Sequence, residues 1–322
     1  MGRVKVAVVR GGTSSEYDVS LKSGGHILRN LPHRYHPQDI LIARDGTWHM
    51  GGVPIHPEML AQKSDVVFNA LHGSYGEDGK VQQIFESLGL PYTGSGVVAS
   101  ALGMNKILAR EAFSKHEFKL PRADTVFSYE SAEDGAHRVF RSMSPPWIVK
   151  PSSAGSSIGV GFARSLLELG EAIREARKHS EKVLIEEFIG GREATVCVVG
   201  AFEGGRIHAL PPIEIRKPVG RPVFDFELKY GGEMEEVCPG DFDFSTRLLL
   251  ETLAIGAHES IGARHYSRSD FIVSPKRGIY LLEINTLPGL TEESLLPKAL
   301  AAIDCPFGDF LDHVLTLALQ GK

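Results

Sequence analysis

The first part of the chain alternates short apolar strands, glycine turns and helices, and this pattern restricts its fold more than any other feature. Val4–Val9 is an apolar run rich in β-branched residues that ends at Gly11-Gly12, and a helix is expected over Glu16–Leu31. The pattern recurs when Val66–Leu71 is followed by a glycine turn and a helix over Lys80–Leu88. Alternating strands and helices build parallel sheets, so we expect an α/β fold.

A chain of 322 residues is longer than one hydrophobic core usually serves, and domains of about 100 residues each are therefore expected. We place the boundaries at residues 1–96, 97–182 and 183–322; Gly94-Ser95-Gly96 ends the first alternation of strands and helices. The 42% hydrophobic and 23% charged residues are typical of a globular protein and provide enough apolar material for such cores.

The rest of the chain shows the same kinds of pattern. Ala101, Met104, Leu108 and Ala112 recur at helical spacing and predict one helix that runs from Val97 and closes at Leu120-Pro121. The other expected elements are strands at Trp147–Lys150, Ile158–Phe162, Val183–Phe188, Thr195–Val199, Ile207–Ile215, Asp270–Val273 and Ile279–Ile284, and helices at Leu166–Lys178 and around Leu250–Ile261. The turn chemistry of Ser274–Gly278 favours a hairpin between the last two strands.

Charge and cysteine content exclude several classes of function. A formal net charge of -5 argues against nucleic acid as a partner, because phosphate binding needs an excess of clustered Lys and Arg. Cys197, Cys238 and Cys305 lie far apart without a CxxC pair, which suggests neither a disulfide framework nor a zinc site. With no apolar run of about 20 residues and no leader-like segment, we expect a cytoplasmic protein with small-molecule partners and no membrane contact.

The sharpest chemical signal is a set of polar side chains on the two C-terminal strands. Alternate residues of a strand share a face, so Arg268 and Asp270 point the same way, as do Glu283 and Asn285. Two carboxylates and an amide, without His or Cys, suit Mg²⁺ held together with nucleotide phosphates. The alternative is a solvated polar strand face without a ligand.

Two glycine-containing loops follow strands and bear on phosphate binding. The loop Lys150–Gly159 offers small residues and free backbone N–H groups, which suit a phosphate, although plain turns often have the same composition. It does not match GxxxxGK[ST], and Gly11-Gly12-Thr13 lacks the GxGxxG spacing. A Walker A site and NAD binding are therefore disfavoured.

The order of these motifs resembles the D-alanine-D-alanine ligase family over essentially the whole chain. Four stretches carry the resemblance: Gly11–Ser20; Leu71-His72-Gly73 with Gly76–Gly79; Tyr92–Gly96; and Leu282–Thr286 with Pro288–Thr291. The resemblance implies an ATP-grasp fold with an N-terminal Rossmann-like substrate domain (1–96), a central ATP-grasp lobe (97–182) and a C-terminal lobe with the metal and second-substrate sites (183–322). It also implies a homodimer as the usual arrangement.

The resemblance implies roles at the ATP site. Lys106 and Lys150 match two lysines that contact ATP phosphates, where point charges offset the triphosphate. Glu186, Phe188 and Ile189 match the hinge that receives adenine, and Glu193 matches the carboxylate that holds the ribose. The metal set, which binds two Mg²⁺ ions with Mn²⁺ as an alternative, corresponds to Asp270, Glu283 and Asn285.

The resemblance also implies roles around the two D-alanine molecules. Glu16 matches the partner of the first ammonium group, with His72 beside that substrate. Arg268 and the Gly289 N–H match the donors to the oxyanion, while Ser294 and Leu295 match the site for the second carboxylate. Asp225–Gly231 resembles a mobile loop that closes over the site, with Lys229 and Tyr230 at its inner end. Ser156 and Tyr230 match residues that form a network with Glu16. Without the motif context, His72 as a turn cap, Tyr230 as a packed aromatic and Lys106 as a solvated lysine would be the better interpretations.

The implied reaction is the ATP-dependent ligation of two D-alanine molecules through an acyl phosphate, for peptidoglycan precursor synthesis. A ligase that makes D-alanyl-D-lactate is the nearest alternative, and Tyr230 argues against it because such relatives carry Phe in the loop. A D-serine ligase has no particular feature in its favour. A nucleotide-binding protein without catalytic activity is disfavoured by the presence of Glu16, Ser156 and Tyr230 with the metal set.

The chain departs from the family pattern at a few positions. Arg10 stands where an apolar residue usually ends the first strand, and because a buried unpaired guanidinium is costly, we expect it to reach solvent or a carboxylate. Phe226 occupies a position in the closing loop where relatives often have Tyr, and Lys217–Val223 has no secure alignment. The loops around the site are therefore the part least determined by the resemblance.

Overall fold

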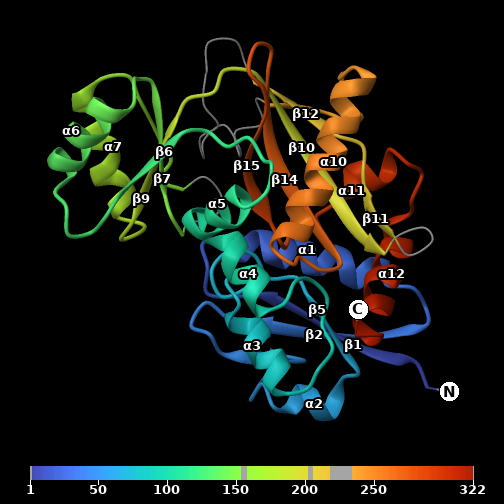
Figure 1. The fold of residues 1–322 in the computed structure, drawn as a ribbon. Helices are drawn as coiled ribbons and strands as arrows, with labels where there is room; N and C mark the ends of the chain where they lie inside the picture. The colour runs from blue at the N-terminus through green and yellow to red at the C-terminus, as the bar shows by residue number, and fades with distance from the viewer. Residues whose placement is uncertain (1, 154–157, 202–205, 218–233, 322) are drawn as a thin grey trace.

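The computed structural model describes residues 2–153, 158–201, 206–217 and 234–321 as three sheets covered by helices (Figure 1). The first sheet has the order β4-β3-β2-β1-β5, with β1 parallel to both β2 and β5, which confirms the expected α/β start. Its strands are β1 (Val4–Gly11), β2 (Tyr35–Ile42), β3 (Trp48–Met50), β4 (Val53–Ile55) and β5 (Val66–Asn69). The helices of this part are α1 (Tyr17–Asn30), α2 (Met59–Lys63) and α3 (Lys80–Ser87).

Both faces of the first sheet are buried, as its nearly continuous apolar strands require. Val6 and Val8 of β1 face one cluster together with Ile27 of α1, whereas Ala7 and Val9 face a second cluster. That second cluster contains Leu60 of α2 together with Val81 and Phe85 of α3. The alternation along β1 therefore fixes α1 on the opposite face from α2 and α3.

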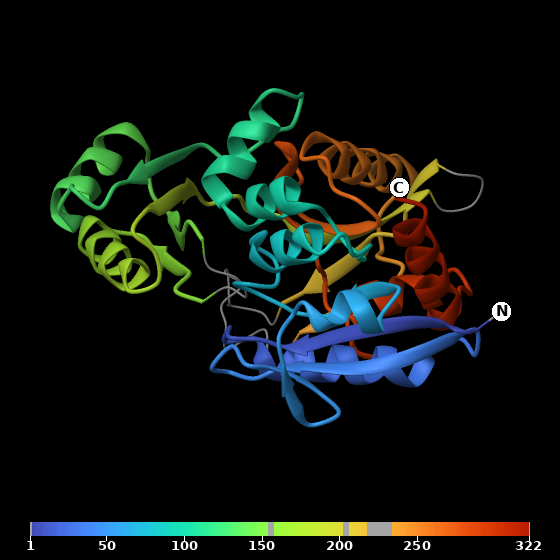
Figure 2. The ribbon, with the colours of Figure 1, turned by 90° about the horizontal axis from the view of Figure 1, so that it is seen from below.

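The second sheet forms a small lobe that stands to one side of the molecule in Figures 1 and 2. Its strand order is β6-β9-β7-β8, and its apolar face packs against two helices around the fully buried Trp147. The elements are β6 (Ala123–Val126), β7 (Trp147–Pro151), β8 (Gly161–Ala163), β9 (Val183–Glu187), α6 (Ala132–Ser142) and α7 (Leu166–Arg177). Because β9 pairs with β6 and β7, we propose that the boundary between the second and third regions follows Glu187.

The third sheet has the order β13-β12-β10-β14-β15, with β11 also paired to β10. Its strands are β10 (Arg192–Ala201), β11 (Arg206–Ala209), β12 (Ile213–Arg216), β13 (Glu235–Val237), β14 (Tyr266–Ser274) and β15 (Gly278–Asn285). The expected C-terminal hairpin is confirmed, since Ser274 pairs with Gly278. The helices are α4 (Val97–Met104), α5 (Lys106–Ser114), α10 (Phe244–Ser260), α11 (Leu295–Ala301) and α12 (Phe307–Leu319).

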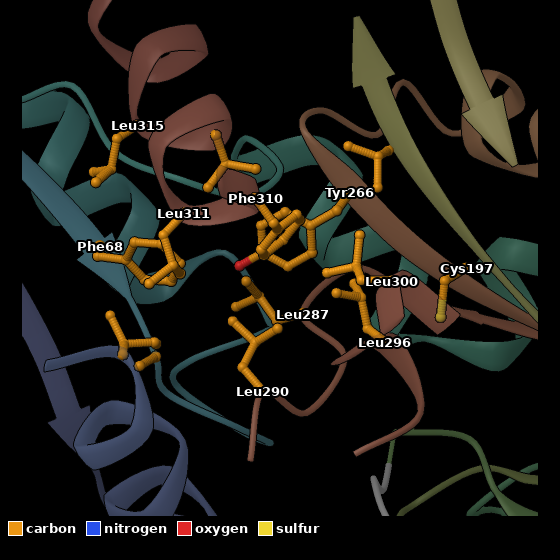
Figure 3. Packing of buried hydrophobic residues seen from close by; sticks show 14 of the residues in the cluster. Phe68, Cys197, Tyr266, Leu287, Leu290, Leu296, Leu300, Phe310, Leu311 and Leu315 are labelled. Carbon is orange, nitrogen blue, oxygen red and sulfur yellow. The ribbon is translucent and has the colours of Figure 1, made fainter. Parts of the chain in front are cut away.

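One continuous core joins the first and third sheets. Figure 3 shows Phe68 of β5 packed near Leu311 and Phe310 of α12, with Tyr266 of β14 against Phe310. Leu287 and Leu290, which follow β15, fill the same core. The two regions therefore cannot move apart without exposing this core, and the segment after β15 is held between them.

Two predicted elements differ from the structure. The single helix expected from Val97 is divided into α4 and α5 at Asn105, whose side chain accepts hydrogen bonds from the N–H groups of Ile107 and Leu108. An Asn side chain that caps a helix in this way starts a new helix, which the apolar spacing alone does not reveal. The strand expected over Ile207–Ile215 is divided into β11 and β12 because Pro211 and Pro212 interrupt it.

Candidate active site

A cavity of about 1990 Å³ lies where the three sheets converge, and all three regions contribute to its lining. Every described residue that the sequence singled out for a site lines this one cavity. They are Glu16, His72, Lys106, Lys150, Glu186, Phe188, Ile189, Glu193, Arg268, Asp270, Glu283, Asn285, Gly289, Ser294 and Leu295. The three remaining candidates, Ser156, Lys229 and Tyr230, lie outside the described residues, as does Phe226.

The hairpin of β14 and β15 brings the acidic residues together. Asp270 is paired with Glu283 across the hairpin, and Arg268 is paired with Asn285. Arg268 and Asp270 share a face, as expected: Arg268 Nε donates to Asp270 Oδ1 at 3.0 Å and Nη2 donates to Oδ2 at 2.8 Å. The Thr195 hydroxyl of β10 donates to Oδ1 at 2.7 Å, so two side chains from neighbouring strands orient the Asp270 carboxylate through three hydrogen bonds.

Glu283 is held strongly in its ionised form. Its Oε2 lies 3.1 Å from Lys106 Nζ, and the charge of Lys106 lowers the pKa of Glu283 to about 2. Burial opposes this shift, whereas Lys150 and Arg268 add to it. Glu283 therefore carries a negative charge near neutral pH.

The composition of this acidic group determines which metal it fits. In the described ranges no three His, Cys, Asp or Glu side chains gather as a preformed metal cage. The hairpin offers two carboxylates and the Asn285 amide, whose oxygen also accepts a hydrogen bond of 2.8 Å from the Leu287 N–H. Such a sparse oxygen set suits Mg²⁺, which usually keeps water ligands and shares its remaining positions with substrate phosphates.

Lys150 enters the cavity from β7 as part of a buried charge network. Its Nζ lies 2.7 Å from Glu186 Oε2, and the other oxygen of Glu186 lies 2.7 Å from Arg110. Burial disfavours the charged ammonium of Lys150, but the Glu186 and Glu283 carboxylates together outweigh this effect, and the pKa of Lys150 is raised. The Glu186 side chain, only 2% exposed, is therefore held between two cations.

Arg110 is a member of this network that the sequence did not reveal. It also donates to the Pro121 carbonyl oxygen, which ties α5 to the start of the second sheet. Arg110 is four residues from Lys106, which places both cations on one face of α5. This spacing is the only feature of the sequence that points to Arg110. Lys106 itself is the first residue of α5, because Asn105 starts the helix there.

An apolar part of the cavity adjoins the connection between β9 and β10. Phe188 packs edge-on against Phe162 with ring centroids 5.4 Å apart, and Ile189 belongs to a small cluster with Ile272 and Tyr280. A flat heteroaromatic ring fits such surroundings.

A carboxylate lies beside this apolar part. Glu193 Oε2 lies 2.6 Å from Lys217 Nζ, and burial raises the pKa of Glu193. Lys217 belongs to the connection without a secure alignment, so this ion pair could not be expected from the resemblance.

Glu16 and His72 line the cavity from the first region. Glu16 directly precedes α1, and its Oε2 lies 2.7 Å from where a Cβ atom of Gly73 would be; the φ of +71° at Gly73 is what favours glycine there. His72 is 5% exposed, with Nε2 2.9 Å from the Ser23 hydroxyl and Nδ1 3.2 Å from the Leu287 carbonyl oxygen. His72 thus lies at the cavity wall with both ring nitrogens hydrogen-bonded.

The segment after β15 supplies the remaining candidates. A Cβ atom at Gly289 would lie 2.8 Å from Ser294 Oγ, which shows how tightly this segment turns. Ser294 directly precedes α11, and its hydroxyl accepts a bond of 3.1 Å from the Thr291 N–H. Leu295 starts the helix and packs against the shared core.

Arg10 lines the same cavity and has the partner that we expected. Its guanidinium donates to both carboxylate oxygens of Asp39, at 2.7 and 2.6 Å. Two parallel bonds of this kind hold the guanidinium rigidly on β2, the neighbouring strand, which removes the cost of an unpaired charge at the end of β1.

Comparison with known proteins identifies related sequences over nearly the whole chain. A family model described as "D-ala D-ala ligase C-terminus" matches residues 116–316, and one described as "D-ala D-ala ligase N-terminus" matches residues 5–58 and 52–95. The D-alanine--D-alanine ligase of Geobacter sulfurreducens is 39% identical, over 98% of this chain and 94% of that protein. The corresponding protein of Desulfotalea psychrophila is 37% identical, over 99% of this chain and 96% of that protein.

Solved structures with the same fold agree with these matches. The VanG D-Ala:D-Ser ligase from Enterococcus faecalis superposes with a TM-score of 0.88 at 29% identity, covering 98% of this chain and 99% of that chain. The D-alanyl-alanine synthetase A from Vibrio cholerae superposes with a TM-score of 0.86 at 26% identity, covering 99% of both chains. In the part of this chain that is described, no helix is long and apolar enough to cross a membrane.

Proposed function

The chain belongs to the D-alanine-D-alanine ligase family, with the ATP-grasp fold, and we propose that it joins two D-alanine molecules into D-alanyl-D-alanine with ATP. The product serves peptidoglycan precursor synthesis. The observation that carries this proposal is that one cavity collects two lysines, a carboxylate pair and the candidate residues for both amino acids. Loss of any one of these three groups would leave the reaction without a phosphate site, a metal site or a substrate site.

ATP occupies the part of the cavity between the second and third sheets in this proposal. Lys106 and Lys150 contact its phosphates, and the apolar surface near Phe188 and Ile189 receives adenine. The Glu186 side chain acts here by holding Lys150, within the hinge that the resemblance assigns to adenine. The Glu193 carboxylate accepts hydrogen bonds from the ribose hydroxyls, which replace part of its contact with Lys217.

Asp270, Glu283 and Asn285 fit Mg²⁺, with Mn²⁺ as an alternative, and we propose that they hold two ions. The bound metal would neutralise charge on the transferring phosphoryl group. The fit rests on the oxygen-only composition of the hairpin and on the ionised state of Glu283. Arg268 keeps the Asp270 carboxylate oriented toward the cavity.

The proposed reaction has two chemical steps. The carboxylate of the first D-alanine attacks the γ-phosphorus of ATP, which releases ADP and forms an acyl phosphate. The amine of the second D-alanine then attacks the acyl carbon, and the tetrahedral intermediate expels phosphate to leave the amide. Arg268 and the Gly289 N–H donate to the oxyanion of that intermediate.

The two amino acids occupy neighbouring parts of the cavity in this scheme. Glu16 pairs with the ammonium group of the first D-alanine, and His72 lies beside that substrate. Ser294 and the start of α11 at Leu295 receive the carboxylate of the second. The resemblance assigns closure of the site to residues 225–231, with Lys229 and Tyr230, and to Ser156, all of which lie outside the described residues; such closure would exclude water from the acyl phosphate.

We also propose that the enzyme is cytoplasmic and forms a homodimer. The reaction consumes ATP, and Cys197, Cys238 and Cys305 are all free thiols, which suits a reducing compartment. The dimer is the usual arrangement in the family. Analytical ultracentrifugation tests it, and a single species at the 35.1 kDa of one chain would contradict it.

A D-alanine:D-serine ligase is the second candidate function, because the VanG D-Ala:D-Ser ligase superposes with a TM-score of 0.88. The alternative of a D-alanyl-D-lactate ligase is disfavoured by Tyr230. These products differ only in the nucleophile at the second subsite, so the acceptor must be tested directly.

Phosphate release by the purified protein with ATP and Mg²⁺ tests the proposal. D-Alanine, L-alanine and D-alanine mixed with D-serine or D-lactate are compared, and the products are identified by mass spectrometry. We expect D-alanine-dependent release with D-alanyl-D-alanine as the main product. No D-alanine-dependent release would favour a protein without catalytic activity, and a mainly mixed product would assign the chain to one of the other ligase types.

A further inference from the structure

Helix α1 holds the segment that carries Gly289 through two side chains one helical turn apart. His26 Nδ1 lies 2.8 Å from the Leu290 carbonyl oxygen, and the Leu290 N–H lies 3.3 Å from Ser23 Oγ. Both backbone polar groups of Leu290 are thus bound to α1. Leu290 is 1% exposed, so these bonds form in surroundings from which water is largely excluded.

The bond from His26 continues to Ser294 through a single peptide group. A carbonyl oxygen only accepts, so His26 Nδ1 carries the hydrogen and donates to Leu290. The N–H of the same peptide belongs to Thr291 and donates to Ser294 Oγ at 3.1 Å. His26, the peptide and Ser294 therefore form one chain of hydrogen bonds, in which each bond polarises the next.

The His26 ring is itself fixed in place. It stacks on Phe307 at the start of α12, with ring centroids 4.3 Å apart and planes 8° from parallel. The imidazole also lines the cavity, so it reaches the wall of the site as well as the backbone behind it. A ring held by stacking and by a hydrogen bond constrains the segment more than a flexible side chain would.

We propose that His26 is a positioning residue for the second amino acid, because it sets the Leu290–Thr291 peptide and through it the Ser294 hydroxyl. This inference rests on the proposed function, in which Ser294 receives the carboxylate of the second D-alanine. His26 acts on the acceptor subsite and not on the donor subsite, because its hydrogen-bond chain ends at Ser294 and does not include Glu16. None of the motifs that carry the family resemblance contains His26.

Three substitutions separate the hydrogen bond from the stacking. His26→Asn retains a donor near the position of Nδ1 but loses the stacked ring, whereas His26→Phe retains the ring but has no donor. His26→Ala loses both. His33→Phe, at an exposed position outside the cavity, is the matched control for loss of a histidine.

The readout is dipeptide formation over a wide range of D-alanine concentrations, which gives separate constants for the first and second D-alanine. We expect His26→Phe and His26→Ala to raise the constant for the second D-alanine by roughly three- to tenfold, the effect of one lost hydrogen bond, with the first constant unchanged. His26→Asn is expected to remain within about twofold of the unmodified protein. If His26→Ala fails to fold, the comparison of Asn with Phe decides the question.

A double substitution tests the route through Ser294. Since the two side chains belong to one hydrogen-bond chain, His26→Phe should add little to the effect of Ser294→Ala. Equal behaviour of the Asn and Phe variants, equal changes in both D-alanine constants, or full additivity with Ser294→Ala would each overturn the inference. If the unmodified protein makes no dipeptide in the same assay, the proposed function fails instead, so the two failures are distinguishable.

Discussion

Lys106 Nζ lies 3.1 Å from Glu283 Oε2, so the first residue of α5 meets the second strand of the C-terminal hairpin across the cavity. This ion pair joins a cation expected at the ATP phosphates to a carboxylate expected at the metal. Without nucleotide the two charges neutralise each other. Binding of ATP and metal would then supply each of them with a new partner of opposite charge.

Glu283→Gln removes the charge while keeping the shape of the side chain. We expect turnover to fall on the order of a hundredfold or more, because the metal loses a ligand and several kcal/mol of charge stabilisation on the phosphoryl group. The measurement is the rate of D-alanine-dependent ADP release as a function of Mg²⁺ concentration. Glu175→Gln, at an exposed ion pair on α7, is the control, and equal rates for both variants would move the metal away from this hairpin.

Arg110→Met tests whether the buried network positions Lys150. Removal of the guanidinium leaves Glu186 with one cationic partner, so Lys150 is drawn closer to that carboxylate and away from ATP. We expect the KM for ATP to rise by roughly fivefold, with the constants for D-alanine unchanged. Arg174→Met on the surface of α7 serves as the control. A lower melting temperature with an unchanged KM for ATP would give Arg110 a purely structural role.

Arg268→Lys retains the positive charge but not the planar fork that grips Asp270. We expect kcat to fall roughly 10²- to 10³-fold, as when a donor to an oxyanion is lost. The KM for ATP should change little, since the proposed contact is made in the transition state. Steady-state kinetics decide the point, and a raised KM with unchanged kcat would assign Arg268 to ground-state binding.

His258 provides a test of stability against pH. It is 2% exposed beneath β14, with Nδ1 2.8 Å from Ser267 Oγ, and burial lowers its pKa to about 4. The folded state therefore favours the neutral ring. The contribution of neutral His258 to the free energy of unfolding is fully present above about pH 6.5, the pKa of histidine in the unfolded chain. It is lost as the pH falls from there toward 4, by at most about 1.4 kcal/mol per pH unit.

His258→Leu should abolish the part of this pH-dependent loss of unfolding free energy between pH 6.5 and 4 that comes from His258. Urea titrations at several pH values measure it, with His33→Leu as the control for an exposed histidine. The two proteins are expected to show different slopes of unfolding free energy against pH. Parallel slopes would mean that His258 titrates alike in the folded and unfolded states.

The sequence predicted several of the strands and helices in which one period dominates, but it did not reveal β2, α6 or α12. The parallel start of the first sheet and the C-terminal hairpin follow from apolar runs and turn residues, and the hairpin alone places Asp270 opposite Glu283. The break at Asn105 was missed because the apolar spacing continues through it. Helix α11 was missed because a seven-residue element carries too little periodicity to detect.

The residues of the site could be predicted from the sequence, but the ion pairs and hydrogen bonds that they make with one another could not. Which cation pairs with Glu186, and that Lys217 reaches Glu193, depend on contacts between elements distant in sequence. Arg110 and His26 have no motif of their own, and each acts through a neighbour. Such positioning residues become visible only when the packing of α1 and α5 against the rest of the chain is known.

The central claim is that the C-terminal hairpin holds the divalent metal against the phosphates of ATP. A crystal grown with Mn²⁺ and ADP, measured at the manganese absorption edge, locates the metal directly through its anomalous scattering. We predict anomalous peaks at bonding distance from oxygens of Asp270, Glu283 and Asn285, with Lys106 and Lys150 on the nucleotide phosphates. Manganese bound elsewhere, with these three side chains unliganded beside a bound nucleotide, would contradict the account.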